Sequence, residues 1–205
     1  MKATILTLIA AVLLTATTTT YATAAATKTN QVITLTGITG ISKIEAHGNV
    51  EVFITNGSKD GVKVYDENYY ANGALVQQEN GTLRIANYDK SKKLIVEVTV
   101  TDLRNVVAYD NAVIKSDKLA LVDLSVDLYN NAYAGLQLSN YAASINVNDQ
   151  AKADLSGDVA EYNLTYSYAA TVNRSELTAM NTTENRVAAP VRRTPRTAPR
   201  VMASI

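Results

Sequence analysis

VVAYDNA (residues 106–112), VDLYNNA (126–132), INVNDQA (145–151) and LTYSYAA (164–170) are four copies of one short pattern, spaced 19 to 20 residues apart. Each copy has an apolar alternation, a polar step and a closing alanine. This pattern is typical of a short strand followed by a turn. Because copies this short cannot bury a core alone, they must stack on one another.

The length of the repeat favours a solenoid. A unit of this size has room for two or three strands of about five residues with turns between them, as in one coil of a parallel β-helix. Antiparallel hairpins of a sandwich would give a similar density of strands. The copies, however, keep the same small residue in the same place, as expected where alanines line up at a crowded corner. We therefore predict an all-β fold with a short, parallel β-helix-like solenoid of 19–20-residue coils over residues 102–185.

The polar step of each copy is suited to a corner of the coil. It reads Asp110-Asn111, Asn130-Asn131 and Asp149-Gln150 in the first three copies. Asn and Asp tolerate left-handed backbone, and their side chains can form hydrogen-bond ladders between stacked coils. Residues 173–185 lose the alternation and are predicted to close the end of the stack, since a terminal repeat needs a less apolar face.

The region before the repeats, residues 27–101, is predicted to form β-strands that precede the solenoid. Apolar and polar residues alternate at 31–35, 41–46 and 50–54, and Asn56-Gly57 is a strong tight-turn signal. Residues 95–100 are the most β-branched stretch of the chain. Helical spacing is not sustained over a useful length in this half.

The first 26 residues have the pattern of a signal peptide. Lys2 provides a positive start, residues 5–14 are apolar, and small residues follow near position 24. We therefore expect an exported protein in the periplasm, on the cell surface or outside the cell. The mature chain is expected to lack a transmembrane segment, because no later run approaches 18 apolar residues. Without cysteine, neither disulfides nor a lipid-modified cysteine is available.

The other terminus, residues 186–205, is expected to be a disordered Arg/Pro tail. It contains five arginines, no acid and all three prolines of the chain. Without these arginines and Lys2 the chain has 13 bases and 19 acids, so the body is acidic. The tail is interpreted as a solvated terminus or as a weak electrostatic contact with an anionic surface or with the acidic body. The acidic body argues against nucleic acid as a partner.

The order of these features resembles the "putative auto-transporter adhesin, head GIN domain" family of secreted Bacteroidetes proteins. The matching features are the strands at 44–54, the turn at 56–57, the strand at 62–64, the segment 81–85, and the strand 96–100 followed by Leu103. The resemblance covers residues 31–180. It implies a right-handed β-helix-like exported domain with a role in adhesion.

Catalytic and metal-binding motifs do not emerge from the residues. His47 is the only histidine, and no strained nucleophile motif accompanies it. Five coil acids suggest a glycosidase pair or a calcium site, but the spacing of either signature is missing. These acids are Asp123, Asp127, Asp149, Asp154 and Asp158. We therefore predict no catalytic residue, metal or cofactor; the alternative is a glycan-processing enzyme, either a polysaccharide lyase or a glycosidase, on a β-helix.

Tyrosines that recur through the coils are the predicted ligand-binding residues, together with neighbouring asparagines. If equivalent positions stack, the rings form a row suited to a neutral sugar or a protein strand. The alternative is that the rings cap the core and brace its corners. The predicted site residues are Tyr109, Tyr129, Tyr133, Tyr141, Tyr166, Tyr168, Asn130 and Asn131, and Tyr162 belongs to the same recurring set.

The sequence thus predicts an exported, non-enzymatic, adhesin-like or scaffolding domain that binds a glycan or a surface protein through a β-helix face. Unpaired solenoid ends also favour self-association, so a homo-oligomer is part of the prediction.

Overall fold

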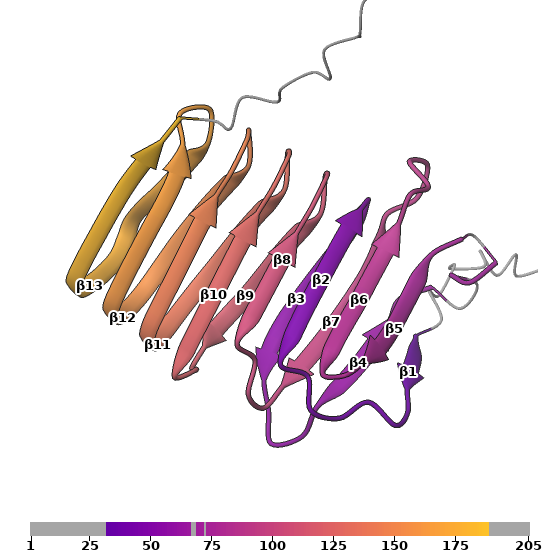
Figure 1. Ribbon diagram of the computed structural model, residues 1–205. Coiled ribbons are helices and arrows are strands. Elements are labelled where there is room, and N and C mark those ends of the chain that lie inside the picture. The colour runs from indigo at the N-terminus through magenta and orange to yellow at the C-terminus, as the bar shows by residue number, and fades with distance from the viewer. Residues whose placement is uncertain (1–31, 67–68, 72, 189–205) are drawn as a thin grey trace, which may run out of the picture.

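The computed structural model describes residues 32–66, 69–71 and 73–188, and within them it is all-β. The strands, shown in Figure 1, are β1 (Ile33–Leu35), β2 (Lys43–Gly48), β3 (Val50–Asn56), β4 (Gly61–Val64), β5 (Leu75–Glu79), β6 (Thr82–Asn87), β7 (Leu94–Val100), β8 (Asn105–Ala108), β9 (Val113–Leu119), β10 (Asp123–Leu128), β11 (Tyr133–Val147), β12 (Lys152–Ser167) and β13 (Thr171–Val187). In this part of the chain we find no helix capable of crossing a membrane.

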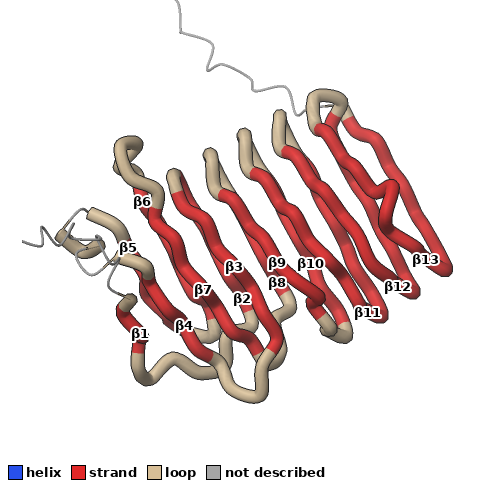
Figure 2. The backbone as a smooth tube through the Cα atoms, turned by 180° about the vertical axis from the view of Figure 1, so that it is seen from behind, coloured by secondary structure: helices blue, strands red, loops and turns tan. Residues whose placement is uncertain are grey.

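The strands form flattened coils with two faces. One face contains β5, β6, β2, β8 and β10, and the other contains β1, β4, β7, β3 and β9. The long strands β11, β12 and β13 bend from one face to the other, which Figures 1 and 2 show as continuous ribbons around one edge. We call this edge, at residues 139–142, 158–160 and 178–180, the corner edge. The opposite edge, at residues 109–112, 129–132, 148–151 and 168–170, is the turn edge.

The ladders between coils are mostly parallel, as a solenoid requires. Ser125 pairs with Ser144 and Ser144 with Asn163, so each coil lies about one repeat beyond the last. Antiparallel pairs occur at the N-terminal end, where β4 lies between β1 and β7 and β5 pairs with β6. The predicted all-β, β-helix-like fold is confirmed.

The coils do not follow one another in sequence order. β2 lies between β6 and β8, and β3 lies between β7 and β9, all in parallel register. In Figure 1 the indigo pair β2 and β3 is accordingly flanked by strands made later in the chain. The N-terminal strand region is therefore part of the same stack as the repeats. The stack has no break at residues 101 and 102, where the two predicted regions meet.

The turn edge has the predicted corner geometry. Asp110, Asn130 and Asp149 have φ angles of 60°, 59° and 53°, in the left-handed region. Their side chains form a ladder: the Asn130 Oδ1 accepts a hydrogen bond from the Asp110 N–H at 3.2 Å, and the Asp149 Oδ2 accepts one from the Asn130 N–H at 2.9 Å. The alanines that close the first three copies, Ala112, Ala132 and Ala151, are fully buried.

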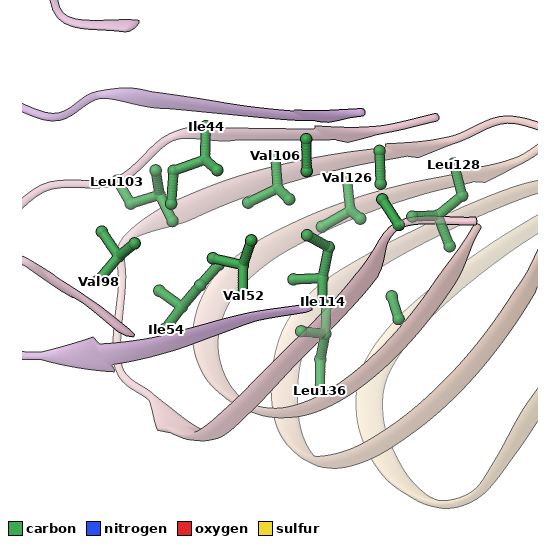
Figure 3. Close-up of a cluster of buried hydrophobic side chains, with 14 of the residues drawn as sticks. Ile44, Val52, Ile54, Val98, Leu103, Val106, Ile114, Val126, Leu128 and Leu136 are labelled. Carbon is green, nitrogen blue, oxygen red and sulfur yellow. The ribbon is translucent and has the colours of Figure 1, made fainter. Parts of the chain in front are cut away.

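Apolar side chains from both faces fill the interior. Ile44, Val106 and Val126 align in register on one face. Val52, Ile54 and Ile114 come from the other face, as Figure 3 shows. All six are at most 1 % exposed. Each such side chain contributes about 1.5–3 kcal/mol by its burial, so the stack needs no disulfide to be stable.

The last coil, formed by β13, covers the end of the apolar core with charged side chains. Leu164 is opposite Glu184 in register, and Glu184 forms an ion pair with Arg174 from the other half of β13. The Tyr166 hydroxyl donates to the Glu184 Oε1 at 2.8 Å, and the Arg186 guanidinium lies 5.5 Å from the Tyr166 ring centre. These contacts fit the prediction that the segment after Asn173 closes the stack. β13 continues to Val187, into the expected tail; residues 189–205 of that tail and the expected signal peptide lie outside the described residues.

Candidate functional site

Three aromatic side chains stack along the turn edge. The rings of His47 and Tyr109 are 4.5 Å apart with an angle of 8° between their planes, and the rings of Tyr109 and Tyr129 are 5.0 Å apart at 9°. Each residue directly precedes the left-handed residue of its turn, which is Gly48, Asp110 or Asn130. Because the turns are in register, the rings lie directly over one another. We call His47, Tyr109 and Tyr129 the ring column.

Stacking determines which part of each ring can meet a ligand. The ring faces within the column are turned toward one another and all three residues are partly buried, so a ligand would meet ring edges rather than these faces. Burial, with a smaller effect of the Asp127 carboxylate, raises the pKa of Tyr129 above its ordinary value. The hydroxyl therefore remains a neutral hydrogen-bond donor and acceptor at neutral pH.

A second column lies beside the rings and consists of amide side chains. Asn49, Asn111 and Asn131 each follow the left-handed residue of their turn, and Asn111 and Asn131 are exposed. Asn130, by contrast, has its side chain engaged in the corner ladder. Of the two predicted asparagines, Asn131 is thus placed to meet a ligand, whereas Asn130 supports the turn.

A cleft of about 260 Å³ adjoins the N-terminal end of the ring column. It lies between the turns that follow β2 and β8 and the loop that follows β6. Its lining includes Asn49, Asn111, Asp110, Tyr88 and Lys90. The Tyr88 side chain is 68 % exposed, so it offers a ring surface that the stacked rings do not.

The other predicted tyrosines lie elsewhere on the molecule. Tyr133 is on the opposite face, where its hydroxyl donates to the Asp154 Oδ2 at 2.7 Å. Tyr141 is at the corner edge and is 64 % exposed. Tyr166, near the end of β12, and Tyr168, in the turn after β12, both contact the guanidinium of Arg186 in the last coil. The structure therefore brings Tyr109 and Tyr129 together but does not bring these four tyrosines to the ring column.

Tyr162 has the core role that the alternative interpretation gave to the tyrosines. Its side chain is 1 % exposed, and burial raises the pKa of Tyr162 to about 12.

His47 and the cleft were not predicted as parts of this surface. The sequence contains a signal for His47, because His47-Gly48-Asn49 has the same order of ring, left-handed residue and amide as Tyr109-Asp110-Asn111. Gly48 replaces the usual Asp or Asn, so the copy is harder to detect. The Tyr88 side of the cleft comes from a loop that follows no repeat.

Three of the five coil acids have structural contacts. Asp127 accepts a hydrogen bond from the Asn146 Nδ2 at 2.8 Å, Asp149 accepts one from the Asn130 N–H, and Asp154 accepts one from Tyr133. These contacts join neighbouring coils, so the acids act as rungs between strands. Within the described ranges, no cluster of three or more His, Cys, Asp or Glu side chains is placed to hold a metal ion.

Comparison with known proteins gives a family match over most of the chain. Residues 40–189 match a family described as "Putative auto-transporter adhesin, head GIN domain". Among curated protein sequences no match is found.

Solved structures give a likeness of fold. A crystal structure described as a putative adhesin from Parabacteroides distasonis has a TM-score of 0.50 and 12 % identity, covering 78 % of this chain and 81 % of the other. A putative adhesin from Bacteroides fragilis has a TM-score of 0.40 and 13 % identity, covering 77 % and 97 %. A putative lipid binding protein from Parabacteroides distasonis has a TM-score of 0.38 and 11 % identity, covering 77 % and 96 %.

Proposed function

Since the chain belongs to the "putative auto-transporter adhesin, head GIN domain" family, we propose that it is an exported, non-enzymatic attachment module that binds a neutral glycan at its turn edge. The family supports an adhesin-like role, and the geometry of the turn edge supports the choice of surface and ligand. The location outside the cytoplasm rests on the leader pattern in the sequence.

The observation that carries this proposal is the pairing of the ring column with the amide column. The rings of Tyr109 and Tyr129 stack with centres 5.0 Å apart, and the exposed Asn111 and Asn131 stand two residues further along the same turns. Phenol and amide groups both donate and accept hydrogen bonds, as sugar hydroxyls do. Recognition is therefore expected to occur through hydrogen bonds at ring edges, while Tyr88 in the cleft provides a ring face for a sugar to pack on.

The test is a glycan-binding screen with the purified chain, followed by variants of the turn edge. Tyr109→Phe with Tyr129→Phe removes both hydroxyls and keeps the stacked rings. We expect the affinity for the bound glycan to fall about tenfold, since each lost hydrogen bond is worth about 0.5–1.5 kcal/mol, while the melting temperature stays nearly constant. Tyr133→Phe on the opposite face is the matched control.

Unchanged affinity in the double Phe variant would show that the ligand binds elsewhere. Binding of a surface protein but of no glycan would overturn the choice of ligand. The non-enzymatic part has a separate test: incubation with cell-wall and host polysaccharides, followed by analysis of chain length. Any shortening of a polysaccharide by the purified chain would contradict this part of the proposal.

A further inference from the structure

The corner edge carries a column of exposed apolar side chains. Asp123, Ala142, Glu161 and Asn181 follow one another in register, so the residues that precede them, Val122, Tyr141, Ala160 and Met180, lie in a row along this edge. The side chains of Val122, Tyr141 and Met180 are 68 %, 64 % and 85 % exposed. Contiguous exposed apolar surface of this kind marks an interaction site more often than isolated apolar residues do.

A groove of about 390 Å³ lies along this column. Tyr141 and Met180 form part of its lining, together with the buried Val159 and the partly buried Ala179. Asn140 also lines the groove, is 6 % exposed, and has an Nδ2 with no hydrogen-bond partner among the described residues. A buried donor without a partner costs about 1–3 kcal/mol, which a docked carbonyl oxygen would recover.

A polar groove of about 430 Å³ lies next to this groove, on the adjoining face. The two grooves are joined by β11, β12 and β13, which run from Gln137 to Ser139, from Ser156 to Asp158 and from Glu176 to Thr178. The polar groove is lined by Asp154 and Glu176, and Asp158 lines the apolar groove, two residues along β12 from Ser156 of the polar groove. An occupant that matches both grooves therefore has basic residues followed by apolar ones.

Residues 189–205 of the same chain have this order. Arg192, Arg193, Arg196 and Arg200 come first, no acid is present in this segment, and Val201, Met202 and Ile205 follow among small residues. Unlike charges so arranged attract over roughly 8–10 Å at physiological salt.

The segment is also long enough to reach both grooves. Val187, the last residue of β13, pairs with Ser167 at the turn edge. From there to the corner edge is the length of residues 181–187, about 23 Å at about 3.3 Å per residue. Residues 189–200 can span about 40 Å when extended. The arginines can therefore lie along the polar groove while the apolar end reaches the corner edge.

We propose that residues 189–205 dock on these two grooves of their own chain, with the arginines against Asp154, Asp158 and Glu176 and with Val201, Met202 and Ile205 against the apolar column. This proposal concerns the corner edge and is independent of the glycan site at the turn edge.

Cysteine cross-linking tests the proposal, because the chain contains no cysteine of its own. In the full chain, Thr178→Cys with Met202→Cys places one thiol in the groove and one near the chain end. The control pairs Met202→Cys with Asn163→Cys, an exposed position of β12 on the opposite face. We expect several-fold more intrachain disulfide in the groove pair. Ser139→Cys with Met202→Cys provides a second groove pair if Thr178→Cys disturbs folding.

Charge-reversal variants distinguish docking of residues 189–205 in the grooves from chance collisions between the two thiols. Asp158→Lys with Glu176→Lys should lower the yield of the groove disulfide, as should about 1 M salt, whereas Glu79→Lys at the far end of the stack should not. Equal yields in the groove and control pairs, or disulfides only between two chains as separated by size-exclusion chromatography, would overturn the proposal.

Discussion

Gly48 shows how one residue combines two demands at the turn edge. Its φ of 77° matches the left-handed angles of Asp110 and Asn130, which stand at the same place in later coils. Unlike those residues it cannot have a side chain, because a Cβ at this position would overlap the carbonyl oxygen of Asn87. The neighbouring coil thus approaches so closely that glycine is required.

We predict that Gly48→Asn is destabilising even though Asn occupies the equivalent position 130. The new Cβ must displace the backbone of Asn87, which should lower the free energy of unfolding by about 2–3 kcal/mol. Gly40→Asn is the matched control, since Gly40 has a φ of 70° and no atom within 4 Å of an added Cβ. Urea unfolding of both variants measures the difference; equal costs would mean that backbone angle alone is responsible.

Asp60 joins two segments that are distant in sequence. Its Oδ2 accepts a hydrogen bond from the Ile41 N–H at 2.9 Å, and its Oδ1 accepts bonds from the Thr101 N–H at 2.8 Å and hydroxyl at 2.9 Å. Burial alone would raise the pKa of the Asp60 carboxyl, but these hydrogen bonds outweigh burial and hold the pKa below its ordinary value.

This pKa gives a dependence of stability on pH. Because the folded-state pKa lies below the unfolded value of about 3.9, the stabilisation is complete above roughly pH 5 and is lost as the pH falls through the folded pKa. We predict that Asp60→Asn costs about 1–3 kcal/mol at pH 7 and progressively less below about pH 4. Denaturant titrations from pH 7 to pH 2.5 measure this, with the exposed Asp158→Asn as control. A cost that does not vary with pH would contradict the assignment.

At the scale of elements, β13 differs from the strands below it in what it turns toward the core. Glu184 stands above Leu164 and Ile145 of earlier coils and forms an ion pair with Arg174, and Tyr166 donates to Glu184. An identical apolar coil cannot stack on this ion pair without burying two charges, which costs several kcal/mol per ion. The charged coil therefore disfavours end-to-end growth of the stack.

Replacing the ion pair with apolar side chains should make this end of the stack prone to self-association. We predict that Arg174→Leu with Glu184→Val produces concentration-dependent oligomers larger than any that the unsubstituted chain forms, detected by light scattering after size-exclusion chromatography. Asn173→Leu with Asn185→Val adds similar apolar area at outward positions of the same strand and should associate far less. Equal association of the two variants would show that the direction of these side chains does not matter.

The elements of the repeat could be predicted because a strand, a turn and a closing alanine are local features. The left-handed corners at Asp110, Asn130 and Asp149 followed from the same local chemistry. The directions of the side chains were harder to predict, because a shift of one residue along a strand moves a side chain to the other face. Tyr166 illustrates this: it pairs with the buried Val147 and so turns toward the end of the core, away from the ring column.

At the scale of the whole molecule, stability should be graded along the stack, because each coil contacts only its neighbours. Coils in the middle have a partner on both sides, whereas β13 has only β12. The slowest exchange is therefore expected in β8, β9, β10 and the first half of β11, and the fastest in β13 and β1.

Hydrogen exchange followed by mass spectrometry measures this gradient. Opening of the central coils should cost several kcal/mol more than opening of β13, so their amides should exchange at least about tenfold more slowly. The antiparallel end at β4 and β5 provides an internal comparison, with intermediate protection. Uniform exchange across all coils would indicate that the stack opens as one cooperative unit.

The order of coils could not have been predicted from local pattern, since nothing in residues 43–56 indicates that their neighbours are residues 82–100 and 105–119. Ile44 pairs with Leu83 and Val106, at separations that no turn signal connects. For the same reason, only part of the ring column could be predicted from the sequence. The repeat places Tyr109 and Tyr129 in equivalent positions, but His47 joins them only because β2 lies beside β8.

The position of β2 and β3 between later strands also determines the order in which the coils can form as the chain is made. β2 pairs with β6 and β8, and β3 pairs with β7 and β9, so the first coil has no ladder partner until residue 82 is present. In a polypeptide that emerges N-terminus first, from a ribosome or through a membrane channel, the ladders of β2 and β3 therefore cannot form before residue 82 has emerged. The coil formed by β2 and β3 is therefore completed only after β6, β7, β8 and β9 have been made and have paired on both sides of it.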